Sequence, residues 1–244
     1  MGEISANLMS ISKQIAVLAN QTEPIFKTKF PRLVAVSKTK PIRDILEAYE
    51  SGQRYFGENY VQELIDKAND SIILEKCPDI RWHFIGNLQS NKVNKICSKV
   101  PNLECVETVD SSHLAELLNK ALDRESKALR VFVQVNTSRE DQKNGTDIDD
   151  ALDLVDFIKT SCPKLNFSGF MTIGSLGQSL DQEKNDEFRI LRTLREKYCV
   201  NCSVPIENVE LSMGMSSDFE VAIKMGSTNV RVGSAIFGNR DLKS

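Results

Sequence analysis

Lys38 stands where an amine could react. It follows the apolar run at residues 33–36 and alternates in step with Val34 and Val36, so the three side chains share one face of the expected strand. A lysine on a buried face loses hydration, which lowers its pKa and favours the neutral amine. Neutral amines attack carbonyl carbons and form Schiff bases. The alternative is a surface lysine that reaches solvent at the strand end, and residue types alone do not decide between the two.

Arg231 is the second informative side chain. It lies between Val230 and Val232 in the last apolar run of the chain. A permanently charged guanidinium that points into a core needs a partner. A bound anion or a pyridine nitrogen would satisfy it, and the alternative is a structural ion pair with Glu210 on the neighbouring expected strand.

Small polar residues follow the last two expected strands. The first segment runs from Ser212 to Asp218, and Ser216 is its predicted helix N-cap, next to N–H groups that could face an anion. The second is Gly233 with Ser234, which offers two more amides. Loops after the seventh and eighth strands of barrels frequently bind phosphate. An amine, a guanidinium and a phosphate cradle together point to pyridoxal 5′-phosphate (PLP).

Alternating apolar runs and amphipathic stretches must position these groups. Eight strand-then-helix units can be counted, which predicts a parallel sheet. A (β/α)₈ barrel needs about 250 residues and carries its chemistry at the carboxyl ends of the strands. The competing doubly wound sheet usually has a Gly-rich first turn, which is missing after the first expected strand. The expected strands lie at residues 33–36, 55–56, 82–85, 106–109, 131–136, 170–173, 209–212 and 230–232.

We therefore predict an α/β protein with a single (β/α)₈ TIM barrel and an extra N-terminal helix. Ile4, Leu8, Ile11, Ile15 and Leu18 recur at helical spacing before the first strand. One domain is expected over residues 1–244, with residues 1–30 as the N-terminal helix and lead-in. No Pro-, Gly- or Ser-rich tract divides the chain.

Composition excludes several classes of function. The 244 residues are 41% hydrophobic, which is ordinary for a soluble globular protein. Lys and Arg number 31 against 34 Asp and Glu, a net charge of −3. Nucleic acid and anionic membranes are therefore not expected partners. No run approaches ~18 apolar residues, so no transmembrane helix is expected. The first helix is amphipathic rather than a targeting segment, and we expect a cytoplasmic protein.

Cysteines do not suggest a metal site. Cys199 and Cys202 form a C-x-x-C pair, but a zinc site would need a second pair or suitably spaced histidines. The two histidines, His83 and His113, are thirty residues apart. We expect reduced thiols and no metal.

Six segments in order carry a family resemblance: 35–38 (AVSK), 56–60 (FGENY), 82–86 (WHFIG), 169–174 (GFMTIG), 211–216 (LSMGMS) and 230–238 (VRVGSAIFG). They resemble the pyridoxal phosphate homeostasis protein family, and the resemblance covers nearly the whole chain from Leu33 to Arg240. It implies a barrel like the N-terminal domain of alanine racemase, with PLP on Lys38 as a Schiff base.

The resemblance also implies roles for single residues. Arg231 would sit near the pyridine nitrogen, Asn59 beside the ring, and Ser216 on the phosphate. His83 would line the pocket or, equally, be a hydrogen-bonded core histidine. The predicted cofactor-binding residues are Lys38, Asn59, Ser212, Ser216, Arg231, Gly233 and Ser234, with no catalytic and no metal-binding residue.

Two functions remain open on the sequence. Racemisation needs two bases, one on each face of the substrate carbon. In the related racemases a tyrosine from a second domain is one of them, and this chain ends at Ser244, soon after the last strand. An arginine at the pyridine nitrogen also weakens the electron sink. We predict a non-catalytic, monomeric PLP-binding protein that buffers PLP or delivers it to PLP-dependent apo-enzymes. The alternative is a PLP-dependent amino-acid racemase or decarboxylase of fold type III.

Overall fold

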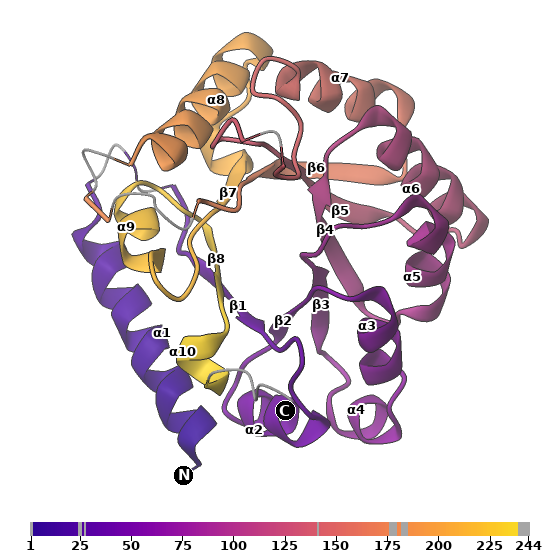
Figure 1. Cartoon of the computed structure of the whole chain (residues 1–244), viewed down its shortest axis with the longest axis vertical. Helices are drawn as coiled ribbons and strands as arrows, with labels where there is room; N and C mark the ends of the chain where they lie inside the picture. The colour runs from indigo at the N-terminus through magenta and orange to yellow at the C-terminus, as the bar shows by residue number, and fades with distance from the viewer. Residues whose placement is uncertain are drawn as a thin grey trace.

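A closed barrel of eight parallel strands forms the centre of the molecule (Figure 1). The computed structural model describes residues 2–23, 26, 28–140, 142–175, 180–181 and 185–238. The strands follow one another in chain order, and β1 pairs with both β2 and β8, which closes the barrel. The predicted (β/α)₈ barrel is confirmed, and an open doubly wound sheet is excluded.

The elements alternate as the apolar pattern predicts. The strands are β1 (Arg32–Val36), β2 (Tyr55–Glu58), β3 (Arg81–Phe84), β4 (Leu103–Val109), β5 (Leu129–Gln134), β6 (Leu165–Met171), β7 (Glu210–Ser212) and β8 (Asn229–Val232). The helices are α1 (Glu3–Gln21), α2 (Ile42–Glu50), α3 (Val61–Ala68), α4 (Ser71–Lys76), α5 (Val93–Lys99), α6 (Ser112–Arg124), α7 (Ala151–Ser161), α8 (Asp186–Cys202), α9 (Phe219–Lys224) and α10 (Ser234–Phe237). Short 3₁₀ turns occupy Ser90–Lys92 and Ile206–Asn208.

Helix α4 is the element that the sequence did not predict. Its only buried residue is Ile73, while Ile72 and Leu74 are exposed, so no apolar face recurs at helical spacing. The side chain of Asp70 caps it by accepting a hydrogen bond from the Ile72 amide at 2.9 Å. A short helix of this kind is stabilised locally rather than by an amphipathic stripe.

The N-terminal helix belongs to the barrel's outer layer. In α1 the apolar face predicted from the sequence is buried, and the helix packs against α2, α9 and α10 (Figure 1). It therefore covers the side of the barrel where the chain's first and last strands meet. None of the helices in the described ranges combines the length and the apolarity needed to cross a lipid bilayer.

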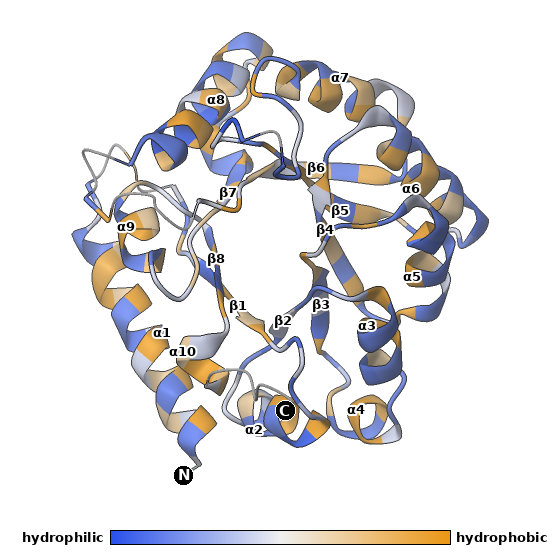
Figure 2. Cartoon of the chain, viewed as in Figure 1, coloured by the Kyte–Doolittle hydropathy of each residue, from blue (hydrophilic) through white to orange (hydrophobic). Residues whose placement is uncertain are grey.

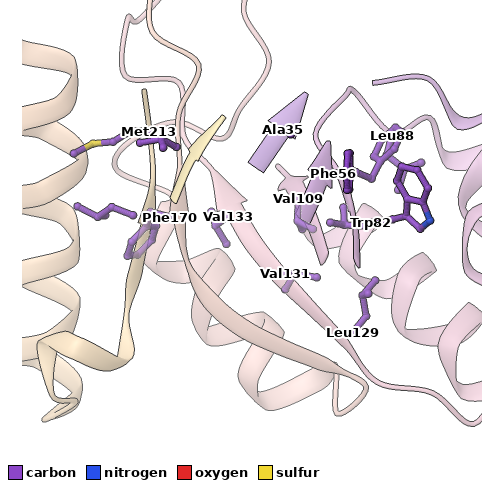
Figure 3. Close-up of a cluster of buried hydrophobic side chains, with 14 of the residues drawn as sticks. Ala35, Phe56, Trp82, Leu88, Val109, Leu129, Val131, Val133, Phe170 and Met213 are labelled. Atoms are coloured by element: carbon purple, nitrogen blue, oxygen red, sulfur yellow. The ribbon is translucent and has the colours of Figure 1, made fainter. Parts of the chain in front are cut away.

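Most of the apolar core lies between the strands and the helices. Apolar residues form stripes on the helices (Figure 2), and Figure 3 shows Trp82 and Phe170 directed from their strands toward the surrounding helices. The barrel interior holds a smaller apolar cluster of Cys105, Phe132 and Met171. Because this inner cluster is small, the interior has room for buried polar side chains beside it.

Candidate functional site

A cavity of about 580 Å³ lies at the carboxyl ends of the strands. Its size falls within the ~300–1,000 Å³ of typical small-molecule sites. Polar lining residues include Lys38, Lys40, Asn59, Ser216, Ser217, Arg231 and Ser234, and apolar ones include Val36, Ile85, Ile173 and Met215. Six of the seven predicted cofactor-binding residues line this cavity, counting Gly233. Ser212 is not among its described lining residues.

Lys38 lies on the turn just beyond the end of β1. The side chains of Val34 and Val36 lie within about 3.0 and 3.5 Å of the point where a Cβ on Gly57 would stand, so this face of β1 crowds the inside of the barrel. Lys38, half-buried, is two residues beyond Val36 and lines the cavity. The geometry fits the inward orientation, while the lowered pKa of its amine stays a prediction.

The residues on either side of Lys38 are held from outside the barrel by a buried ion cluster. The Nζ of Lys67 on α3 donates to the Ser37 carbonyl at 2.7 Å and to Glu58 Oε1 at 2.8 Å. Ser37 Oγ also donates to Glu58 Oε1, at 2.6 Å. Burial raises the pKa of Glu58, and the charge of Lys67 acts in the opposite direction.

Glu63 extends this cluster to the next residue of the loop. Its Oε1 accepts from Lys67 Nζ at 2.7 Å and from the Thr39 amide at 2.5 Å. Thr39 has a φ of 63°, a left-handed conformation that is costly for a β-branched residue. The hydrogen bond to its amide helps hold that conformation, so the loop that presents Lys38 is fixed on both sides.

Arg231 points into the barrel and is 3% exposed. Its Nη1 donates to Ser212 Oγ at 2.5 Å, and its Nη2 donates to the Thr172 carbonyl at 2.7 Å. Burial lowers the pKa of Arg231, and the Glu107 carboxylate, 3.9 Å away, acts in the opposite direction.

The alternative pairing of Arg231 with Glu210 is wrong. Glu210 begins β7, at the amino-terminal end of the barrel, and its carboxylate pairs with Arg32 at 2.7 Å and Arg130 at 2.9 Å. Arg231 lies further along β8, toward the cavity, so the two residues belong to different layers. The anionic group that faces Arg231 is Glu107.

Glu107 is a fully buried carboxylate on β4. Its Oε1 lies 2.5 Å from His83 Nδ1, and its Oε2 accepts from Ser212 Oγ at 2.5 Å. Asn229 Nδ2 donates to both oxygens, at 3.1 and 3.3 Å. Burial by itself raises the pKa of Glu107, but the hydrogen bond and charge of His83, with the charge of Arg231, lower it to about 2.

His83 is therefore a core histidine rather than a pocket residue. It is fully buried and bonds Glu107, and it is not among the described residues that line the cavity. Its Nε2 has no hydrogen-bond partner among the described residues. This outcome agrees with the second of the two roles expected from the sequence.

Because the pKa of Glu107 is lowered, the free energy of unfolding is expected to depend on pH in the acid range. Between pH 4.5 and about 2 this carboxylate is protonated in the unfolded chain but ionised in the folded one. Because the unfolded state then binds more protons, the free energy of unfolding is expected to fall as the pH falls, by on the order of 3 kcal/mol from this group. Urea denaturation across this pH range should show that the free energy of unfolding falls less steeply with pH for Glu107→Gln than for the parent. If the two proteins lose stability in parallel as the pH falls, the prediction is wrong.

The predicted phosphate loops meet, although not as the sequence suggested. Ser216 Oγ accepts from the amides of Gly233 at 3.2 Å and Ala235 at 3.5 Å, so the loops after β7 and β8 touch. The prediction that Ser216 is an N-cap is wrong. Helix α9 begins after Asp218, whose carboxylate bonds the Met215 amide at 2.5 Å and tightens the turn. Ser216 lies two residues before the cap and lines the cavity instead.

Asn59 forms the wall on the β2 side. Its Oδ1 is buried and has no hydrogen-bond partner among the described residues. A Cβ at Gly86 would stand 2.0 Å from the Asn59 carbonyl oxygen, so only glycine permits this approach of the loops after β2 and β3. The close contact helps to place Asn59 in the lining of the cavity.

The two cysteines of the C-x-x-C pair are not among the described residues that line this cavity. Cys199 and Cys202 are free thiols on α8, the first buried and the second exposed. Burial raises the pKa of the Cys199 thiol. Within the described ranges, no group of three or more metal-ligating side chains is gathered.

Three residues that sequence reasoning did not select support the site: Glu107, Asn229 and Lys67. One signal was available, because a glutamate inside the apolar run 105–109 is costly to bury without partners. Asn229 and Lys67 gave no comparable signal, since a polar residue at a strand start and a lysine on a helix are both ordinary.

Comparison with known proteins places the chain in a family. Residues 7–241 match the family described as alanine racemase, N-terminal domain. The chain is 55% identical to the pyridoxal phosphate homeostasis protein of Mus musculus over 213 residues, 86% of this chain and 77% of that protein. It is 47% identical to the protein of that name from Caenorhabditis elegans over 247 residues, 99% of this chain and 98% of the other.

Solved structures agree. PipY of Synechococcus elongatus, determined with PLP bound, has a TM-score of 0.75 at 34% identity, over 93% of this chain and all of that one. Alanine racemase of Clostridium difficile shares the fold, with a TM-score of 0.68 at 14% identity over 98% of this chain and 58% of its own. From the family match, the identity to these relatives and the closed barrel with its cavity at the strand ends, the chain belongs to the pyridoxal phosphate homeostasis protein family.

Proposed function

We propose that this protein binds PLP as a Schiff base on Lys38 and takes part in PLP homeostasis in the cytoplasm, by buffering the cofactor or delivering it. The observation that carries the proposal is one cavity of about 580 Å³ in which an amine, a guanidinium and two touching loops meet. The names of the relatives and the PLP-bound PipY structure support it. When bound, PLP supplies an aldehyde that condenses with amines and a ring that withdraws electrons.

The reactive end and the ring of PLP each have a counterpart in the lining. Lys38 would offer its amine to the aldehyde, and Arg231 would donate a hydrogen bond to the ring nitrogen. The unpartnered buried Oδ1 of Asn59 fits a hydroxyl donor on the ring. Ser212 would affect PLP only through Arg231, because its hydroxyl contacts Arg231 rather than the cavity.

The phosphate end has its counterpart in the last two loops. Ser216 Oγ and the amides of Gly233 and Ser234 would hold the phosphate oxygens. In this structure the Gly233 amide donates to Ser216 Oγ, so the two groups already lie together, and binding of the phosphate would exchange this bond for bonds to its oxygens. We take residues 1–244 as one PLP-binding domain, with residues 1–30 as the N-terminal helix and lead-in; α1 itself packs on the outside of the barrel.

The lining favours holding PLP over turning over an amino acid. Racemisation needs acid–base groups on both faces of the substrate carbon. Apart from Arg231, the described lining offers Lys38 and Lys40 as its basic side chains, while Tyr60 lines a separate hollow and is 51% exposed. A guanidinium at the ring nitrogen also keeps that nitrogen unprotonated, which weakens electron withdrawal.

One observation favours a second candidate, a racemase or decarboxylase of fold type III. Lys40 brings a second amine to the cavity, and the alanine racemase fold is shared. Lys40 lies in the loop beyond the strand, two residues after Lys38. The two amines therefore come from the same loop, whereas racemisation needs acid–base groups on both faces of the substrate carbon.

A transfer experiment separates the two functions. The protein is loaded with PLP, freed of excess, and mixed with a PLP-dependent apo-enzyme, with light scattering to measure its mass. We expect a yellow monomer that holds one equivalent of PLP and restores the apo-enzyme's activity. Alanine racemisation and decarboxylation should not exceed those of free PLP at equal concentration. Steady turnover of a free amino acid would overturn the carrier proposal.

A further inference from the structure

We propose that Glu107 is a positioning residue that fixes Arg231 through the hydroxyl of Ser212, and so determines how tightly PLP is held. The inference deepens the proposed function and rests on it. It concerns a side chain that does not line the cavity, so any effect on PLP must pass through another residue.

The hydroxyl of Ser212 has only one way to satisfy its contacts. A serine hydroxyl has one proton and two lone pairs. Its oxygen lies 2.5 Å from Glu107 Oε2, 2.5 Å from Arg231 Nη1 and 2.9 Å from Asn229 Nδ2. Arginine and the asparagine amide nitrogen only donate, so the proton of Ser212 points to Glu107. Both lone pairs then face the two donors, and Arg231 always finds an acceptor there.

Arg231 is consequently held at two points. Nη1 bonds Ser212 at the end of β7, and Nη2 bonds the Thr172 carbonyl just beyond the end of the neighbouring strand β6. Because a guanidinium is planar and rigid, two such bonds fix the plane of the whole group. The donors that remain are available at the cavity wall, which Arg231 lines.

Glu107 contributes charge as well as direction. Its Oε2 lies 3.9 Å from Arg231 Nη1, and both side chains are almost fully buried. Asn229 donates to both carboxylate oxygens and His83 bonds Oε1, so the carboxylate itself does not rotate. The group that supplies the compensating charge is thus the group that orients Ser212.

The test compares two Glu→Gln changes on the same strand. Glu107→Gln keeps the shape but places either a neutral acceptor or a donor against Ser212. We expect PLP affinity to fall by about 10- to 100-fold, as when a hydrogen bond to a charged group is lost, with a shifted absorption maximum of bound PLP. Glu107→Asp should retain part of the affinity. The control is Glu104→Gln on β4, whose carboxylate pairs with Arg130, and it should change affinity less than twofold.

A double-mutant cycle shows whether the effect passes through Arg231. In an Arg231→Gln background, Glu107→Gln should have little further effect on PLP affinity. If the two substitutions lower PLP affinity by independent factors that multiply, the inference is overturned. Wild-type PLP affinity in Glu107→Gln would also overturn it.

If Glu107→Gln does not fold, the PLP affinity of Ser212→Ala is measured against that of Ser168→Ala on β6. Equal affinities of these two variants would overturn the inference too. If the parent itself binds no PLP, the proposed function fails instead.

Discussion

The Lys38→Ala variant is expected to form no covalent adduct with PLP. Borohydride reduction of the PLP-loaded parent should fix a pyridoxyl group on Lys38, found by peptide mass mapping, and the variant should show none. The physical reason is that Lys38 lines the cavity from the turn just beyond β1, and the Lys67 cluster fixes this turn. The yellow colour of the loaded protein should be lost as well.

Lys40→Ala is the matched control for this experiment. Lys40 lines the same cavity two residues further along the chain, so its removal changes charge and volume in the same place. We expect Lys40→Ala to keep the adduct on Lys38 and most of the PLP affinity. A pyridoxyl group mapped to Lys40 in the parent, or retained in Lys38→Ala, would refute the assignment of the site.

The Lys67→Met variant should lose about 3–5 kcal/mol of unfolding free energy, the usual cost of removing one partner from a buried ion pair. Lys67 is 8% exposed and Glu58 is fully buried, so the carboxylate would lose its 2.8 Å partner without access to water. Burial already raises the pKa of Glu58. The loss should therefore be greatest above that pKa, where ionised Glu58 is left unpaired, and smaller in acid, where the group is neutral.

Chemical denaturation measures this loss, and Lys120→Met is the control. Lys120 pairs with Glu116 at 3.3 Å on an exposed face of α6, so its removal should cost less than ~1 kcal/mol. Adding Glu58→Gln to Lys67→Met should restore part of the stability, because no unpaired charge then remains. Lys67→Met should also weaken PLP binding, since the Ser37 carbonyl loses a donor. Equal, small losses in Lys67→Met and Lys120→Met would show that the cluster is not important.

Much of the fold could be predicted from the chain because each strand and helix carries its own local signal. The apolar run 33–36 and the amphipathic stretch after Pro41 each indicate one element, and their alternation predicts a parallel sheet. The spacing of Leu8 and Ile15 predicts the N-terminal helix in the same way. Helix α4 could not be predicted in this way, because only Ile73 is buried and no stripe forms.

The parity of the strands also carried part of the site. The period of two along a strand puts Lys38 in step with Val36, and Arg231 in step with Gly233, but it left open whether either side chain points inward. The carboxyl ends of parallel strands share one rim, so the residues would meet only if both point inward. The position of Ser216 was misjudged because an N-cap depends on where the helix begins, and Asp218 is an equally good cap by residue type.

The sequence by itself determined the barrel and the residues at its rim, because both follow from short-range periodicity. The tertiary structure alone decided which charges pair inside it. Arg231 could have paired with Glu210, but the stagger of the strands puts Glu210 at the amino-terminal end and brings Glu107, 124 positions earlier in the chain, to 3.9 Å. Lys67 reaches Glu58 because α3 packs against the outside of the barrel next to β2. Such pairings depend on strand register and helix placement, which no local pattern contains.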